Sequence, residues 1–280
     1  MIYIIVPTFA KVDQTIKFLD SIKNSVENNY LIILIDDHPK NLTLNNIQQN
    51  EFIRIIPSKK ELWWVGSINL GIQIIFREYK LNDDDIVVFA NNDVQIEKKS
   101  FDVLKFEIQN NSSQIVHPRT FDQNNFEVSS GAKIHSTFPY ITTHPKGFKS
   151  KRKKIDMGTA RFLMMCGITL KKVGFINQEL IQYGGDNDFT MAANRFHNIE
   201  TYILRDAYCK LDDTVTGIKN HNIKNMKELS NSFFSIKSPN NFKYRYRLFK
   251  KFYGKFRAFF ITLSLSINTI LKFYLNKILK

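Results

Sequence analysis

The sequence has few cysteines, no long apolar run and no secretion signal. Its two cysteines, Cys166 and Cys209, are too few for a disulfide framework, and we interpret them as buried thiols in a reducing cytosol. No uninterrupted apolar run reaches the roughly 18 residues of a membrane-spanning helix. The best candidate, AFFITLSLSINTIL at 258–271, is short and contains Ser, Thr and Asn. The opening MIYIIVPTF lacks a basic segment, so we expect no secretory signal.

Several catalytic motifs are also missing. The chain has no Gly-x-Ser-x-Gly elbow, no Cys-x-x-Cys pair and no His-Glu-x-x-His. Nucleophilic-serine chemistry and structural zinc therefore lose support. Residues 7–15 contain no glycine, which disfavours a nucleotidyltransferase, because such an enzyme would need a glycine-rich phosphate loop there.

Acidic residues are absent from the last fifty positions. Residues 231–280 hold eleven Lys or Arg and no Asp or Glu, so they carry +11 of the net charge of +14. They also hold 13 of the 37 aromatic residues. A basic aromatic tail of this kind favours a polyanionic partner, either a membrane surface or a nucleic acid.

Apolar β-branched runs alternate with helical patterns in the first part of the chain. The runs end at Pro, Asp or Asn, and the helical patterns repeat at three- and four-residue spacing. This alternation predicts an α/β layer fold with a mostly parallel sheet. We expect strands at 2–6, 31–35, 52–56 and 86–90, and helices at 12–26 and 67–79.

The second part of the chain is less regular. We expect strands at 115–119, 126–135 and 200–204, an apolar segment at 160–170, a helix at 188–196, and an exposed loop at 139–155 that contains a run of Lys and Arg. The body of the protein is expected to end near residue 216.

Polar residues follow the predicted parallel strands, and such strand ends meet at one sheet edge where ligands bind. Asp93, after the strand at 86–90, could hold Mg²⁺ or Mn²⁺ with support from Asn91 or Asn92. The alternative is an ordinary turn. Asp36 could bind a ribose, or it could cap a helix or lie in a solvated turn.

Two glycine-containing segments add candidates. LWWVGSINLGI at 62–72 leads into a helix whose first N–H groups could bind an anion, although one or both tryptophans could be core. YGGDNDF presents Asp186 and Asp188 on a glycine turn, either as a general base or as helix-capping acids. His221 is a further possible metal ligand, although a lone histidine is more often structural.

Taken in order, these segments resemble the family 2 glycosyltransferases, which are inverting enzymes with the GT-A fold. The similarity rests on IIVPTFA, LIILIDDHP, WWVGSINLGI, VVFANNDVQI and FLMMCGITLKKVGFINQELIQYGGDNDFTMAANRF, and it covers about residues 1–210. The third segment is closest to bacterial rhamnosyl- and galactofuranosyl-transferase-like members. Two departures stand out: Asn91 begins the DxD-like triplet, and Gly185 stands where many relatives have Glu.

The resemblance implies a fold and a division of the chain. The fold is α/β of the GT-A type: a single, mostly parallel sheet flanked by helices, with a Rossmann-like nucleotide-binding half and a basic aromatic C-terminal helical tail. The transferase domain would span 1–230, with the nucleotide half at 1–97 and the acceptor and catalytic half at 98–230. Residues 231–280 would be the amphipathic, membrane-associating tail.

The resemblance also implies residue roles. Asp93 and Asn91, with Asn92 nearby and His221 as a further ligand, would hold Mg²⁺ or Mn²⁺ on the donor diphosphate. Asp186 would be the base that activates the acceptor hydroxyl, with Asp188 as the fallback. Nucleotide and donor contacts would come from Pro7, Thr8, Asp36 and Asn69.

The implied reaction transfers a sugar from a UDP- or dTDP-linked donor to a saccharide or lipid-linked acceptor, in O-antigen or capsule synthesis. The protein would be cytoplasmic, bound peripherally through its tail to the inner face of a bacterial membrane, and a possible homo-oligomer without a nucleic-acid partner. The alternatives are a tail that packs on the body, a membrane-tethered protein that binds nucleotide sugar without turnover, or a nucleotidyltransferase.

Overall fold

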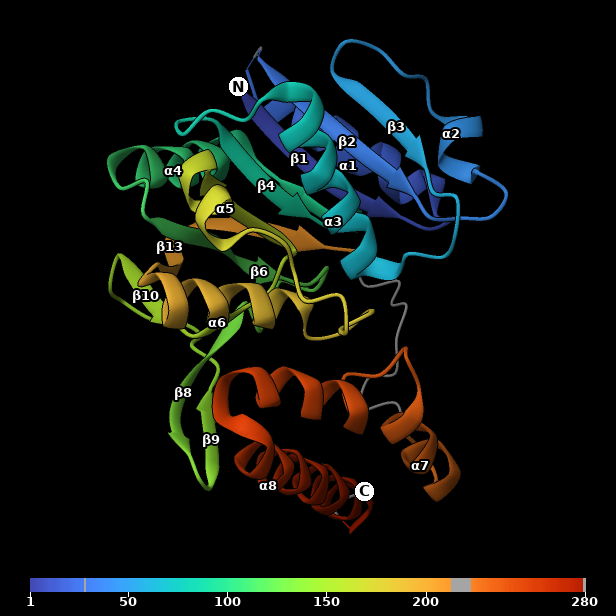
Figure 1. The fold of residues 1–280 in the computed structure, drawn as a ribbon, viewed down its shortest axis with the longest axis vertical. Helices are drawn as coiled ribbons and strands as arrows, with labels where there is room; N and C mark the ends of the chain where they lie inside the picture. The colour runs from blue at the N-terminus through green and yellow to red at the C-terminus, as the bar shows by residue number, and fades with distance from the viewer. Residues whose placement is uncertain (28, 213–222, 279–280) are drawn as a thin grey trace.

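The computed structural model describes residues 1–27, 29–212 and 223–278. Its N-terminal half is a parallel sheet built from the apolar runs, in the order β3-β2-β1-β4 (Figure 1). β-branched residues favour this extended, buried conformation. The elements are β1 (Ile2–Thr8), α1 (Val12–Ser25), β2 (Tyr30–Asp36), α2 (Leu42–Asn46), β3 (Ile53–Pro57), α3 (Trp63–Ile74), the π-helix η1 (Ile75–Tyr79) and β4 (Ile86–Ala90).

The second half extends this sheet with mixed strand directions. β12 lies antiparallel between β4 and β6, and β13 continues the sheet parallel to β6. The elements are β5 (Val94–Ile96), α4 (Lys98–Asn110), β6 (Gln114–Phe121), β7 (Glu127–Val128), β8 (Gly131–Thr137), β9 (Tyr140–Thr143), β10 (Arg152–Ile155), β11 (Met157–Gly158), β12 (Phe162–Cys166), α5 (Gly167–Val173), α6 (Gly185–His197) and β13 (Glu200–Leu211). The predicted fold class is confirmed, and a small sheet, β11-β8-β9, is added to it.

Both faces of the main sheet are buried, because successive side chains of a strand point to opposite faces. Ile4 and Val88 contribute to the core shared with α1 and α4. Ile5 and Phe89 contribute to the core shared with α3, α6 and the C-terminal helix. Near-continuous apolar strands are what a sheet covered on both faces requires.

The strand ends meet at one edge, as predicted. Thr8 at the end of β1 is in register with Asp36 at the end of β2, and Asp36 is in register with Pro57 at the end of β3. β4 pairs with β1 on the side of β1 away from β2, and Asn91 directly follows β4. Residues far apart in the chain therefore come together at this edge.

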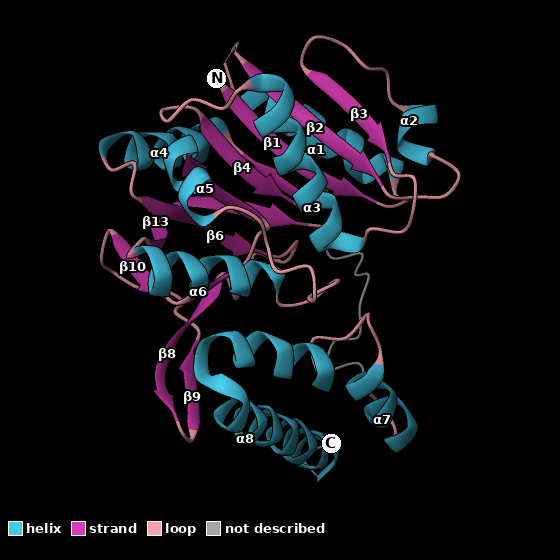
Figure 2. Ribbon diagram, in the orientation of Figure 1, coloured by secondary structure: helices cyan, strands magenta, loops and turns pink. Residues whose placement is uncertain are grey.

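The prediction of an exposed loop at 139–155 is wrong for two segments. Residues 140–143 form β9, which pairs with β8 in a hairpin that projects from the sheet (Figure 2). Residues 152–155 form β10 at the edge of the main sheet. A run of Lys and Arg is typical of an exposed loop, but basic side chains are also common on edge strands, where they discourage further pairing.

The C-terminal tail is helical and returns to the body of the protein. It contains α7 (Met226–Phe234), which crosses the predicted boundary at 230, and α8 (Phe242–Ile278). Gly254 has φ 77° and divides α8 into two segments that lie one below the other in Figure 1. A positive φ favours glycine, which lacks a Cβ. The first segment, 242–253, buries Tyr244, Leu248 and Phe249 in the core.

The expectation that no helix could span a membrane needs revision. Within the described residues, one stretch of α8, Phe242–Leu275, is long and apolar enough for this by length and composition alone. Of its most apolar window, 33% is buried inside the protein. The break at Gly254 leaves 255–278 as a separate helical segment.

Candidate functional site

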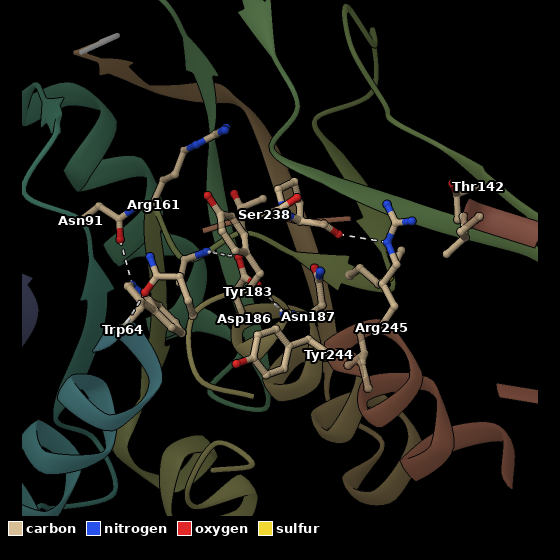
Figure 3. Close-up of a pocket in the computed structure, with 18 of the residues that line it drawn as sticks. Trp64, Asn91, Thr142, Arg161, Tyr183, Asp186, Asn187, Ser238, Tyr244 and Arg245 are labelled. Carbon is tan, nitrogen blue, oxygen red and sulfur yellow. Dashed lines mark hydrogen bonds between the residues drawn. The ribbon is translucent and has the colours of Figure 1, made fainter. Parts of the chain in front are cut away.

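A cavity of about 560 Å³ opens beyond the strand ends and is lined by both halves of the chain and by the tail (Figure 3). Asn91 and Asp93 reach it from the end of β4, and Asp186 reaches it from the first turn of α6. The tail contributes Tyr244 and Arg245 from the first segment of α8. The predicted metal residue and the predicted base therefore share one cavity.

Asp93 lies between β4 and β5 with its carboxylate largely withdrawn from water. Its Oδ1 atom is buried and accepts no hydrogen bond. Burial raises the pKa of Asp93, while the charges of Arg161 and Lys11 lower it. A buried carboxylate oxygen without a partner is costly, and a cation would satisfy it.

The two asparagines before Asp93 face different surroundings. The Oδ1 atom of Asn91 accepts a hydrogen bond from Trp64 Nε1 at 3.0 Å, at the cavity wall (Figure 3). The amide of Asn92 donates to Thr15 Oγ1 at 2.9 Å and so is directed toward α1. Asn91 thus lies at the site, whereas Asn92 holds the turn against the first helix.

Asp186 is half-buried at the N-terminal end of α6. Its Oδ1 atom accepts from the N–H of Asn187 at 2.8 Å, and its Oδ2 atom accepts from the N–H of Ala160 at 3.4 Å. Burial raises the pKa of Asp186, and these hydrogen bonds and the charge of Arg161 limit the rise. A carboxylate with a raised pKa at a cavity wall has the properties of a general base.

Asp188 has a different environment, although it is only two residues away. It is 1% exposed, and both of its carboxylate oxygens contact Lys251 Nζ of α8, at 2.8 and 2.9 Å. It also accepts from the N–H of Asn177 at 3.2 Å. The structure therefore places Asp188 in the contact between α6 and the tail rather than on the cavity wall.

The predicted nucleotide residues lie at the right edge of the sheet but are engaged within the protein. Asp36 is fully buried and accepts from the N–H groups of His38 and Leu44. Thr8, which follows Pro7 at the end of β1, is also buried and bonds Thr43.

Of the two remaining predicted residues, Asn69 does not line the cavity. Asn69 forms two hydrogen bonds of 2.9 Å with the backbone of Ile176 and so joins α3 to a later loop. His221 lies outside the residues that the structure describes.

Sequence reasoning missed several cavity residues. Arg161, directly before β12, donates to the carbonyl of Ser129 at 2.5 Å, and its charge lowers the pKa of both Asp93 and Asp186. Asp212 follows β13, and its N–H donates to the carbonyl of Asp93 at 2.7 Å. Neither residue belongs to a local motif. Other cavity residues to which the sequence assigned no site role include Tyr140, Gln182, Tyr183, Tyr244 and Arg245.

The residues present fit a divalent cation in part. Among the described residues, no group of three or more His, Cys, Asp or Glu is close enough to form a metal site. Nevertheless Asp93 offers an unsatisfied buried oxygen, and Asp212 and the carbonyl oxygen of Asn91 line the same cavity. Mg²⁺ usually binds through one or two carboxylates, with water and substrate phosphates completing its coordination.

A parallel half-sheet whose strand ends open on such a cavity is typical of enzymes that bind nucleotides. The sequence matches the family described as glycosyl transferase family 2 over residues 3–175, and the chain belongs to that family. This confirms the resemblance inferred from the motifs. The protein therefore has the fold of a family 2 glycosyltransferase.

Solved structures agree on the fold. A structure of GalNAc-T7 with UDP, GalNAc and Mn²⁺ superposes with a TM-score of 0.61 at 9% identity, covering 88% of this chain and 50% of that one. TarS 1–349 of S. aureus in complex with UDP gives a TM-score of 0.54 at 16% identity, covering 75% and 60%. The chain thus spans about half to three-fifths of these proteins. No curated protein matches the sequence.

Proposed function

We propose that the chain is an inverting glycosyltransferase that moves a sugar from a nucleotide diphosphate to a hydroxyl acceptor. The observation that carries this proposal is the pairing of Asp93 and Asp186 in one cavity, with different surroundings. Asp93 has an unpaired buried oxygen suited to a cation, whereas Asp186 is held by backbone N–H groups at the cavity wall. The UDP in the neighbouring structures supports a nucleotide-linked donor.

In this proposal Asp186 accepts the proton of the acceptor hydroxyl while that oxygen attacks the anomeric carbon. The bond from the anomeric carbon to the diphosphate breaks on the opposite face, so the configuration inverts in one displacement. The half-buried position of Asp186 raises its pKa and hence its basicity when ionised. The hydrogen bonds from Asn187 and Ala160 hold its carboxylate in place.

Asp93 would hold Mg²⁺ or Mn²⁺, with Asn91 and Asp212, which line the same cavity, as further oxygen donors. The cation would neutralise charge on the departing nucleoside diphosphate. Arg161 lies close enough to lower the pKa of Asp93, so it would add positive charge at the same end of the cavity. The Mn²⁺ in the GalNAc-T7 structure supports this assignment.

The experiment that tests the base is Asp186→Asn, compared with Asp188→Asn. Amide replacement removes the proton acceptor but keeps the size and most hydrogen bonds, so we expect transfer to fall by about 100-fold or more. Donor binding, measured by thermal shift with nucleotide sugar and Mn²⁺, should be retained. Normal transfer by Asp186→Asn would exclude this residue as the base. Loss of transfer in Asp188→Asn alone would move the assignment there.

We also propose that the second segment of α8 lies on a membrane. Its buried face is mixed: Ala258 and Ile261 pack in the core, and the hydroxyls of Thr262, Ser266 and Thr269 are also turned inward and donate to carbonyls one turn earlier. Its outward face is apolar. We name this face the apolar stripe, and it consists of Phe256, Phe260, Leu263, Ile267, Leu271 and Leu275, each at least 36% exposed.

Basic residues border the stripe, and the β8–β9 hairpin extends it. Lys255, Arg257 and Lys272 are exposed on the same segment. The ring of Phe138, 72% exposed at the hairpin tip, lies 6.4 Å from that of Phe260. An apolar face bordered by Lys and Arg suits the surface of a bilayer that contains anionic lipid. This supports peripheral binding to a membrane. We propose that the membrane is the inner face of a bacterial membrane and that the enzyme acts in the synthesis of a surface polysaccharide such as O-antigen or capsule.

A further inference from the structure

Arg245 brings a positive charge from the tail into the cavity. It lies in the first turn of α8, next to Tyr244, which is anchored in the core. Its Nε donates to the carbonyl of Pro239 at 3.0 Å, and one terminal nitrogen donates to Asn240 Oδ1 at 2.7 Å. The guanidinium is therefore fixed in orientation by the loop between α7 and α8.

The other terminal nitrogen of Arg245 is an unsatisfied hydrogen-bond donor. This Nη1 atom is buried and has no hydrogen-bond partner. No carboxylate of the described residues forms an ion pair with Arg245, and burial alone lowers its pKa to about 10. A buried guanidinium held by neutral oxygens is costly, since a buried charge normally requires an opposite charge. An anion in the cavity would supply that charge.

The position of Arg245 separates it from the expected donor diphosphate. In Figure 3, Arg245 and Asn91 lie on opposite sides of Asp186. Arg161 is the arginine whose charge lowers the pKa of Asp93 and Asp186, and Arg245 contributes to neither. The base contacts the attacking hydroxyl, which approaches the anomeric carbon from the face opposite the departing diphosphate. With Asn91 at the donor end, the side of Asp186 away from Asn91 is therefore the acceptor side.

We propose that Arg245 binds an anionic group of the acceptor, a phosphate or a carboxylate. The proposal rests on the proposed glycosyl transfer and adds the class of acceptor. A guanidinium offers a planar fork that matches both kinds of anion. Ser238 and Thr142 also line the cavity, and Figure 3 shows both near Arg245. The acceptor is thus an acidic or phosphate-bearing saccharide rather than a neutral one.

The test measures anion binding by thermal shift on the full chain, with inorganic phosphate in one arm and methyl glucuronate in the other. The variants are R245Q, K243Q as an exposed control on the same helix turn, and R161Q as a control at the donor side. We expect at least one anion to raise the Tm of the wild type, of K243Q and of R161Q. In R245Q its apparent affinity should fall about 10- to 100-fold, the value of a lost charged hydrogen bond. The arm that responds identifies the group.

Three results would overturn the proposal: no response to either anion in the wild type, an equal response in R245Q, or a response lost in R161Q instead. If R245Q does not give a cooperative melt, R245K decides, because it keeps the charge but loses the fork. Its response should be weaker than that of the wild type, and an equal response counts against the proposal. Donor hydrolysis by the wild type without acceptor is measured separately, so failure of the glycosyltransferase proposal can be told apart from failure of this one.

Discussion

Replacing Lys251 by Met should loosen the tail from the body. Lys251 is the ion-pair partner of Asp188, which is 1% exposed, and removing it leaves a buried carboxylate uncompensated. Breaking a buried ion pair from one side costs about 3–5 kcal/mol. The side chain of Lys251 is 30% exposed, so water can reach its end of the pair, and we lower the expected loss to about 2–3 kcal/mol. For a protein of this size that corresponds to a fall in Tm of about 3–5 °C.

The assay is thermal unfolding of four proteins: the wild type, Lys251→Met, Lys250→Met and the double variant Asp188→Asn/Lys251→Met. Lys250 is the neighbouring exposed lysine, so Lys250→Met should lose little stability. In the double variant no buried charge remains, and the amide oxygen of the new Asn side chain can still accept from the Asn177 N–H. Most of the stability lost in Lys251→Met should therefore return. Equal losses in Lys251→Met and Lys250→Met, or a double variant as unstable as the single one, would refute the reasoning.

Two further predictions concern the membrane and the base. The variant Leu263→Asn/Ile267→Asn should bind phosphatidylglycerol vesicles about tenfold more weakly than the wild type in a sedimentation assay. The control Phe106→Ser, which changes an exposed residue of α4, should bind as the wild type does. Equal binding by all three proteins would exclude the apolar stripe as the membrane contact. Because the pKa of Asp186 is raised, the acid limb of kcat/KM should lie above the ordinary 3.8 of aspartate, with activity lost as the pH falls through the raised value. The folded state also holds this proton more tightly than the unfolded state. Asp186→Asn should therefore have a higher Tm than the wild type at neutral pH, and this difference in Tm should vanish below pH 3.8. An acid limb and a Tm that the substitution leaves unchanged would contradict the assignment.

The nucleotide-binding half could be predicted from the sequence because its signals are local. Each parallel strand is a continuous apolar run, and each ends at a residue that stops it. The general rule for parallel sheets then places Asp36 and Asp93 near one edge. The order of the motifs predicted the family as well, and the family match confirms it.

Side-chain direction could not be predicted in the same way. Asp36 and Asn69 lie in matching motifs, but the structure directs their polar atoms to backbone groups of Leu44 and Ile176. Nothing in a one-dimensional pattern distinguishes a carboxylate that binds backbone N–H groups from one that binds a ligand. The positions of Arg161 and Arg245 depend on contacts between distant segments, which the sequence shows only after folding.

The packing of the tail on the body could not be predicted from the composition of the tail. Its many Lys and Arg indicated an appendage, while Tyr244, Leu248 and Phe249 have the three- to four-residue spacing of a helix that packs on a core. The first segment of α8 packs on the core, whereas the second segment has the exposed face of an appendage. Gly254 marks the change, because its positive φ breaks the helix between them.

This division has a practical consequence for anyone who shortens the chain to obtain a more soluble protein. Removing everything after residue 230 would take away the exposed apolar stripe, but it would also remove Arg245, Leu248 and Phe249 from the wall of the cavity. A shortened protein of that kind could fail in an activity assay for reasons unrelated to membranes. A chain that ends at Gly254 would keep Arg245, Leu248 and Phe249 on the cavity wall and would lose Leu265 from it. Comparing it with the full-length chain therefore largely separates what the tail does for chemistry from what it does for location.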